Sequence, residues 1–292
     1  MGKMFYSLGA FKAGLALARL LPRSMAHAIA PVLGRIGYWH NHAGRKALRT
    51  NLARVTDRIG EEFDKLCASN VTHFSRMIAD YLLCAGKHNL ALELLEEWRG
   101  IENLESALAL GKGVILVTAH LGNWELGATL LALRGLPMSI ITLEEPTSEL
   151  TRWREEHRRQ LGIKTITVGP GHDFAFVEMI QALRRNEILA MLVDRPYAGT
   201  GIPVTLFGNA TDFSTGPALL WQHTGAAVVP AFVLRNPRGR YISFADPTIE
   251  LVANSDPRIA LQENTQRVAT YFESIIREHP EQWFNYVPIW NA

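Results

Sequence analysis

Two ionisable side chains, His120 and Glu125, lie where an apolar run gives way to a helical pattern. The run Val114–Thr118 predicts a buried strand, a Gly-Asn turn follows, and Asn123–Leu133 predicts a helix. Five residues along a regular helix is about 140° from the starting face, so the two side chains converge only if His120 lies in the turn before the helix. Active sites of α/β proteins form at such junctions. The pair suits removal of a proton from a hydroxyl, with Glu125 holding one ring nitrogen of His120, although a lone histidine at a strand end is more often structural.

The start of the same predicted helix offers groups that can bind a negative charge. Backbone N–H groups around Gly122 and Asn123 have no partner within a helix and suit an oxyanion or a phosphate. The spacing alone does not distinguish the two, and we take Asn123 as a candidate substrate-binding residue.

A second apolar run ends in Asp194-Arg195, at what we expect to be the same edge of the sheet. Asp194 is suited to orienting Arg195 or to serving as a second carboxylate near His120, and the alternative is an ion pair that caps a strand. A Gly-rich loop follows and leads to Gly208, a further substrate-binding candidate. Arg158, in a charged helix, suits anchoring a phosphate, and the alternative is a solvated helix face.

Several catalytic motifs are absent from the sequence. It has no Gly-x-Ser-x-Gly elbow, no Walker loop, no Gly-x-Gly-x-x-Gly and no His or Cys cluster with metal-ligand spacing. We therefore expect no covalent serine, no nucleotide site, no metal and no resident cofactor. A histidine and carboxylate without a nucleophilic side chain imply that the nucleophile belongs to the substrate.

The elements that must position these residues follow a clear pattern. Residues 1–108 predict helices, with no strand, and we expect this part to pack on the core and to associate with a membrane. From residue 109 to 292 short apolar strands alternate with helices, which predicts an α/β core, a mixed sheet flanked by helices. The strands are expected at 114–118, 138–142, 165–168, 188–193, 227–234 and 240–245.

Composition limits the function classes. The chain of 292 residues is 48% hydrophobic and 20% charged, which predicts a globular core. Its net charge is only +2, but arginines cluster at 45–58 and at 152–159. Such clusters suit phospholipid headgroups or an acidic carrier protein, and no motif indicates nucleic acid. The two cysteines form no metal or disulfide pattern.

The segment 5–39 is apolar but interrupted by Lys12 and Arg19. A spanning helix needs about 20 mostly apolar residues, so this segment predicts an amphipathic element lying on a membrane, with Lys12, Arg19 and Arg23 at the headgroups. The alternative is an ordinary core helix. Whether it spans the bilayer or lies on it stays open.

The motifs together resemble a known family. His120-Leu-Gly-Asn-Trp-Glu125 is similar to the His-x-x-x-x-Asp/Glu box of lysophospholipid acyltransferases, in the branch of lipid A biosynthesis (lauroyl and myristoyl) acyltransferases and phosphatidylinositol mannoside acyltransferases. Val204-Thr-Leu-Phe-Gly208 and Pro280-Glu-Gln-Trp283 also resemble this branch, in the same order. Lipid A enzymes usually carry Asp-Gln where this chain has Asp194-Arg195, and the basic C-terminal tail of those enzymes is absent. These departures leave the acceptor open.

The resemblance implies a glycerolipid-acyltransferase-like fold and acyl transfer from a thioester donor to a hydroxyl or amine of a lipid or glycolipid, such as a lipid A precursor. His120 would be the general base, with Glu125 orienting it. Coenzyme A or acyl carrier protein would be the co-substrate, and the cytoplasmic face of the bacterial inner membrane the location, with peripheral or monotopic attachment. The alternatives are a thioesterase or lipase that uses the same histidine and a non-catalytic lipid-binding protein. Acceptor, chain length, donor carrier and oligomeric state stay open.

Overall fold

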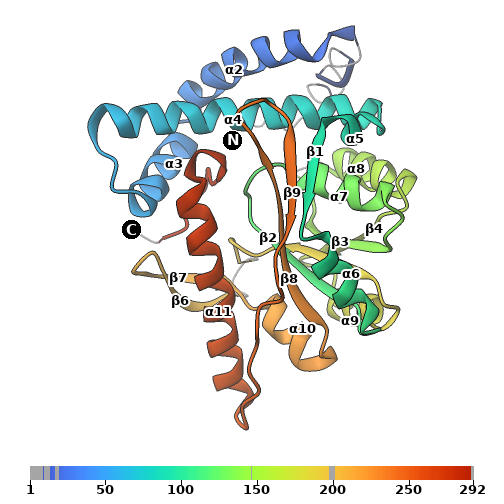
Figure 1. The fold of residues 1–292 in the computed structure, drawn as a ribbon. Helices are drawn as coiled ribbons and strands as arrows, with labels where there is room; N and C mark the ends of the chain where they lie inside the picture. The colour runs from blue at the N-terminus through green and yellow to red at the C-terminus, as the bar shows by residue number, and fades with distance from the viewer. Residues whose placement is uncertain (1–8, 10–13, 17–19, 146, 197–200, 291–292) are drawn as a thin grey trace.

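The central element of the protein is a seven-stranded mixed sheet covered by helices, as expected (Figure 1). The structure, a computed structural model, describes residues 9, 14–16, 20–145, 147–196 and 201–290. Its strands are β1 (Leu95–Arg99), β2 (Val114–Thr118), β3 (Met138–Leu143), β4 (Lys164–Val168), β5 (Ile188–Leu192), β8 (Ala227–Arg235) and β9 (Tyr241–Ala245) in the sheet, and β6 (Gly201–Leu206) and β7 (Asn209–Ser214) in a separate hairpin.

The helices of the described residues follow the expected alternation with the strands. They are α2 (Arg23–His40), α3 (His42–Val55), α4 (Gly60–Gly86), α5 (Leu90–Leu94), α6 (Ile101–Ala109), α7 (Trp124–Leu133), α8 (Ser148–Gln160), α9 (Ala175–Arg184), α10 (Gly216–Thr224), α11 (Pro257–Glu278) and the 3-10 helix η1 (Pro280–Gln282).

The strand order is β1-β9-β8-β2-β5-β3-β4. The five strands β8, β2, β5, β3 and β4 are parallel, whereas β9 pairs with β8 in the antiparallel sense and β1 runs parallel to β9. All five residues of the central strand β2 are buried, which explains its unbroken apolar run. Because the carboxyl ends of parallel strands meet at one edge, residues that follow β2, β5 and β8 come together.

Two cores lie on opposite faces of β2. Ile115 and Val117 belong to the larger one, which also holds residues of α3, α4, α9, α10 and α11. Val114 and Leu116 belong to the other, which holds residues of α6 and α7. The alternation of side chains along the strand therefore assigns each residue to one face.

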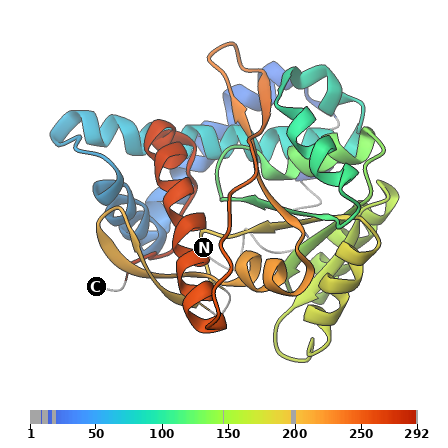
Figure 2. The same ribbon diagram turned by 60° about the horizontal axis from the view of Figure 1, so that its bottom comes forward.

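The expectation that residues 1–108 contain no strand is wrong. Residues 95–99 form β1, the edge strand beside β9. The strand is short and carries charged residues, Glu96, Glu97 and Arg99, and for this reason it lacks the apolar run by which a strand is predicted. The hairpin of β6 and β7 was also not expected, and it lies against α11 (Figure 2).

The helices α2 and α4 lie side by side across one end of the sheet, and the β8–β9 pair reaches toward α4 (Figure 1). Buried Asp80 of α4 joins these elements. Its carboxylate accepts hydrogen bonds from Arg23 of α2 (2.7 and 2.9 Å) and from Tyr241 Oη of β9 (2.8 Å), and it contacts His27 Nε2 (2.7 Å). The helical N-terminal part is thus packed on the sheet.

Candidate active site

Strand register brings the two central side chains of the site together. In the parallel pair of β2 and β5, Thr118 lies opposite Leu192. Two residues beyond each of these positions are His120 and Asp194. The two therefore meet at the carboxyl edge of the sheet, although 74 residues separate them in the chain.

His120 and Asp194 form a hydrogen-bonded pair. Nδ1 of His120 lies 2.8 Å from Oδ1 of Asp194, and the backbone N–H of His120 also donates to this carboxylate, at 3.1 and 3.2 Å. Asp194 is buried, whereas the His120 side chain keeps 19% of its surface exposed. Burial alone would raise the pKa of Asp194, but His120, Arg195 and Trp283 hold that pKa well below its usual range.

The charge of Asp194 sets the tautomer of His120. An ionised carboxylate only accepts hydrogen bonds, so Nδ1 carries the proton and donates it to Oδ1. In the neutral imidazole, Nε2 then carries the lone pair. In the part of the chain that the structure describes, no hydrogen-bond partner occupies Nε2, so this nitrogen is available as a proton acceptor.

The C-terminal segment after η1 completes the support of Asp194. Oδ2 accepts hydrogen bonds from Trp283 Nε1 at 2.9 Å and from Asn285 Nδ2 at 2.8 Å. Trp283 and Asn285 are both fully buried, and the backbone N–H of Phe284 donates to the carbonyl of His120 at 2.7 Å. The segment therefore fixes both members of the pair.

The expected pairing of Glu125 with His120 is wrong, because Asp194 takes that place at the Nδ1 atom. Oε1 of Glu125 instead accepts hydrogen bonds from Arg154 (3.2 Å) and Arg158 (3.4 Å) of α8. Burial alone would raise the pKa of Glu125, but Arg158 and Arg154 outweigh it and lower that pKa. Glu125 lies on the first turn of α7, which directs its carboxylate toward α8.

Arg158 does not offer its charge at a surface. Its side chain is only 9% exposed and is paired with Glu125, so the expected phosphate contact is not available in this structure. Other members of the basic clusters are also paired or stacked. Arg159 pairs with Glu156, Arg49 pairs with Asp64, and Arg45 lies over the Trp39 ring. The Arg159 and Arg49 side chains stay 74% and 44% exposed, so these two pairs lie at the surface, unlike that of Arg158.

The expected oxyanion site at Gly122 and Asn123 is also wrong. The N–H of Gly122 donates to Gln282 O (2.9 Å) and that of Asn123 donates to Val233 O (2.7 Å). Asn123 is fully buried and its side chain caps α7 by accepting from Leu126 N, so it has no surface for a substrate. Gly122 has a φ of +63°, and an added Cβ would lie 2.1 Å from the Val233 carbonyl oxygen. Glycine is required there for the close approach to β8.

Arg195 and Gly208, which were also expected to bind substrate, have contacts or conformations that the fold itself explains. Arg195 donates from Nη2 to the Phe284 carbonyl at 2.9 Å and from Nε to Asn285 Oδ1, so it holds the C-terminal segment. Gly208 is exposed and follows Phe207 in the turn of the β6–β7 hairpin, where both have positive φ (50° and 71°). A two-residue turn of this type favours glycine, so the turn explains Gly208 without a substrate. Residues 197–200 of the Gly-rich loop lie outside the described residues.

Aromatic rings line the surroundings of His120. The Trp124 ring packs edge-on against the imidazole at 5.3 Å, and Phe284 lies 6.4 Å from Trp124. Phe74 of α4 continues the row, 5.2 Å from Phe284. An apolar wall beside a proton-accepting nitrogen suits a substrate with an apolar chain.

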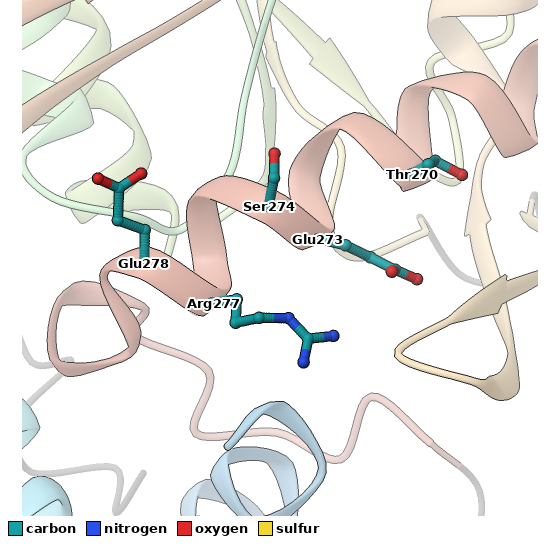
Figure 3. A pocket seen from close by; sticks show the side chains of 5 residues that line it. All are labelled: Thr270, Glu273, Ser274, Arg277 and Glu278. Carbon is teal, nitrogen blue, oxygen red and sulfur yellow. The ribbon is translucent and has the colours of Figure 1, made fainter. Parts of the chain in front are cut away.

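A shallow groove on α11 is separate from this site. Figure 3 shows its lining residues, Thr270, Glu273, Ser274, Arg277 and Glu278, projecting from α11. Glu273 accepts from the backbone N–H of Phe207 (2.6 Å), and the Arg277 guanidinium lies 5.3 Å from the Phe207 ring. These contacts hold the β6–β7 hairpin, which gives the groove a structural explanation.

Fold and site together define an α/β enzyme with a histidine–carboxylate pair at the carboxyl edge of its sheet. The chain belongs to the bacterial lipid A biosynthesis acyltransferase family, whose family model matches residues 4–291. It is therefore an acyltransferase of the type that acts in lipid A and phosphatidylinositol mannoside synthesis.

Individual relatives agree with this assignment. The chain is 28% identical over 287 residues to a phosphatidylinositol mannoside acyltransferase of Mycobacterium tuberculosis, and this match covers 97% of the chain and 88% of the relative. It is 28% identical over 294 residues to the enzyme of the same name from Mycolicibacterium smegmatis (100% and 93%). It is also 26% identical over 271 residues to a lipid A biosynthesis acyltransferase of Haemophilus influenzae (86% and 77%).

Trp283 and Asn285 are site residues that sequence reasoning did not assign. They lie 89 and 91 residues from Asp194 in the sequence, so no local pattern predicts these contacts. The sequence signal for Trp283 is the Pro280-Glu-Gln-Trp283 motif, which supports the family resemblance but does not by itself predict a contact with Asp194.

Proposed function

We propose that this enzyme moves a fatty acyl chain from a thioester donor to a hydroxyl or amine of a lipid or glycolipid acceptor, with His120 as the general base. The observation that carries the proposal is the His120–Asp194 pair. Its geometry leaves Nε2 with a lone pair beside an apolar wall, while Nδ1 is fixed by a buried, ionised carboxylate.

The steps of the reaction follow from this arrangement. Nε2 of His120 takes the proton of the acceptor hydroxyl as its oxygen attacks the thioester carbonyl. Asp194 stabilises the imidazolium that forms, in the way a triad carboxylate does, and hydrogen bonds from Trp283 and Asn285 keep that carboxylate in place. When the tetrahedral intermediate collapses, the C–S bond breaks and the imidazolium returns the proton to the departing thiolate. In this mechanism His120 carries out the proton transfer without a resident cofactor, and the thioester is a co-substrate.

Membrane attachment is a second part of the proposal, and α2 supports it. Apolar side chains follow one face of this helix at helical spacing and are 42% to 67% exposed: Met25, Ile29, Val32, Leu33, Ile36 and Trp39. An apolar stripe of this kind favours a helix that lies in the membrane surface, where the acyl chains and lipid acceptors are. Among the described helices, none is both long and apolar enough to span a bilayer.

The expected headgroup contacts need one correction. Arg23 is bound to Asp80 and to the carbonyl of Gly239, so it serves as an internal anchor of α2. Lys12 and Arg19 lie outside the described residues. The membrane contact is therefore proposed for the apolar stripe. We propose the cytoplasmic face of the inner membrane as its location, because coenzyme A and acyl carrier protein thioesters are available on that side.

The mannoside acyltransferases among the relatives and the Asp194-Arg195 sequence favour a glycolipid of the phosphatidylinositol mannoside kind as the acceptor. A lipid A precursor is the second candidate. The deciding experiment incubates the purified enzyme with a radiolabelled acyl-coenzyme A or acyl carrier protein thioester, with and without extracted glycolipid. We expect labelled lipid only when acceptor is present. Release of free fatty acid at the same rate without acceptor would instead indicate the hydrolase alternative. Lipid mass spectrometry of cells with and without the protein then identifies the species that loses one acyl chain.

A further inference from the structure

Three basic side chains gather between α4 and the end of β8. His73 and Arg76 lie one turn apart on α4, and Arg235 is the last residue of β8. Arg235 pairs with Tyr241 across β8 and β9. Tyr241 Oη donates to Asp80, which lies one turn beyond Arg76 on α4, so Arg235 lies near this part of α4. We call them the His73–Arg76–Arg235 cluster. Figure 1 shows that the β8–β9 pair reaches toward α4.

Each member of the cluster has a buried polar atom without a partner. Within the described residues, Nδ1 of His73, Nε of Arg76 and Nε of Arg235 are buried and have no hydrogen bond. The neighbouring Arg23 is different, because Asp80 receives two of its hydrogen bonds. The three residues are partly exposed as a whole, but a buried polar nitrogen without a hydrogen bond is costly, and a ligand that bonds to it would remove this cost.

The surroundings add to this cost. Burial, together with the charges of Arg235 and Arg76, lowers the pKa of His73 to about 4. Burial also lowers the pKa of Arg235, as do the charges of Arg76 and Arg23, while Asp80 acts in the opposite sense. The carboxylate of Asp80 is already shared by Arg23, His27 and Tyr241. The cluster therefore has an excess of positive charge.

The cluster is connected to the active site through short contacts. Val233, two residues before Arg235, accepts the hydrogen bond of Asn123 N in the turn after His120. The side chain of Gln282 binds the backbone N–H and carbonyl of Arg235, at 2.9 and 3.0 Å, and Trp283 follows it in the chain. On α4, Phe74 lies between His73 and Ser75 in sequence and packs on Phe284. A ligand held by the cluster would thus lie beside the segment that supports Asp194.

We propose that the His73–Arg76–Arg235 cluster binds the phosphoryl group of a substrate. Guanidinium groups match phosphate oxygens with paired N–H donors, and neutral His73 supplies one further hydrogen bond. Substrates of the proposed reaction carry such groups in two places, the coenzyme A part of the donor and the headgroup of a phospholipid acceptor. The inference rests on the proposed function for this choice of ligands. The position of α2, whose apolar stripe is proposed to meet the membrane and which packs on α4, favours the headgroup.

The test measures binding to the full-length protein without turnover. Three probes are titrated by calorimetry: inorganic phosphate, coenzyme A and monomeric dihexanoyl phosphatidic acid, with dihexanoylglycerol as the uncharged match. The variant is Arg76→Gln/Arg235→Gln, and Arg258→Gln is the control, because Arg258 is 92% exposed on α11. We expect the double variant to lose roughly 10- to 100-fold in affinity for the phosphate-bearing probe, as charge-assisted hydrogen bonds are lost. The control should stay within about 2-fold of wild type.

The source of the phosphate is read from the probes. Binding of phosphatidic acid without coenzyme A supports the headgroup, and the reverse supports the donor. The proposal is overturned if no phosphate probe binds to the wild-type protein, if Arg76→Gln/Arg235→Gln binds as tightly as wild type, or if Arg258→Gln loses as much affinity as the double variant.

A second measurement separates binding from a structural role. Without ligand, the melting temperature of Arg76→Gln/Arg235→Gln should equal or exceed that of wild type, because two unpaired cations are removed. With phosphate, the wild-type melting temperature should rise while that of the variant stays fixed. A lower melting temperature without ligand would mean that the arginines serve the fold. Both measurements follow binding and unfolding and can also be made on His120→Ala protein, so failure of the acyl-transfer proposal would leave this test intact.

Discussion

The indole Nε1–H of Trp283 donates to Oδ2 of Asp194 at 2.9 Å, and this bond joins the C-terminal segment to the His120–Asp194 pair. Both residues are almost fully buried, so the bond is not weakened by solvent. With the hydrogen bonds from Asn285 and from His120, the carboxylate has a partner on each oxygen. The arrangement keeps Asp194 ionised and His120 in one tautomer.

The Asp194→Asn variant tests the support of His120. An amide carries no charge, so it no longer stabilises the imidazolium. It also offers an N–H donor as well as an oxygen acceptor, so it no longer ensures that Nδ1 of His120 carries the proton. We expect kcat for acyl transfer to fall by roughly 1,000-fold or more. The measurement is the initial rate with saturating donor and acceptor, with circular dichroism to verify folding. A folded variant with kcat within a few-fold of wild type would contradict this role.

The pairing of Glu125 with Arg158 is tested by stability. Glu125→Gln leaves the buried Arg158 without its counter-ion, and we expect the free energy of unfolding to fall by about 3 kcal/mol. Removing both charges in Glu125→Gln/Arg158→Gln should cost less than the sum of the single changes. Urea titration of the three variants gives the comparison. If the costs simply add, the two side chains are not coupled as the structure shows.

The attachment of α2 through Asp80 predicts a dependence on pH. Burial alone would raise the pKa of Asp80, but the hydrogen bonds from Arg23 and His27 outweigh it and lower that pKa. The ionised form therefore stabilises the fold fully above its unfolded pKa of about 4, and this contribution is lost as pH falls through the lower folded value.

We expect Asp80→Asn to lose about 3 kcal/mol at pH 7 and to be less sensitive than wild type to acid below about pH 4. Urea midpoints measured from pH 7 to pH 3 provide the test. Equal acid sensitivity of both proteins would exclude Asp80 as the group responsible.

The apolar stripe of α2 predicts membrane binding that depends on its side chains. Ile29→Gln/Leu33→Gln removes two residues that are 42% and 56% exposed, and we expect partitioning to vesicles to fall roughly 10- to 100-fold. Co-sedimentation with vesicles of phosphatidylcholine and phosphatidylglycerol measures it. Ile259→Gln is the matched control, since Ile259 is 48% exposed on α11. An equal loss in the control would remove the special role of the stripe.

Sequence reasoning succeeded where the pattern is local. The apolar runs predicted as strands at 114–118 and 188–193 correspond to β2 (Val114–Thr118) and β5 (Ile188–Leu192), because a strand covered on both faces is mostly apolar. The edge strand β1 and the β6–β7 hairpin were missed, because β1 carries charges and β6 begins with Gly201 and contains Pro203, so neither shows an apolar run.

The carboxylate partner of His120 could not be derived from spacing. Glu125 is near in sequence, but the first turn of α7 directs it to α8. Asp194 lies 74 residues away, and only the register of β2 and β5 brings it to Nδ1. A second carboxylate near His120 was one of two roles expected for Asp194, and the structure places its Oδ1 2.8 Å from His120 Nδ1. Trp283 required a contact between the C-terminus and the sheet edge, which no periodicity encodes.

The most direct test of the account is the rate of acyl transfer by His120→Ala. If Nε2 of His120 is the general base, its removal should lower kcat roughly 100- to 10,000-fold while the protein stays folded and still binds membranes. The rate is followed as label transferred from thioester to lipid, beside the wild-type enzyme at the same concentration. A folded His120→Ala protein that transfers acyl chains at near the wild-type rate would contradict the mechanism.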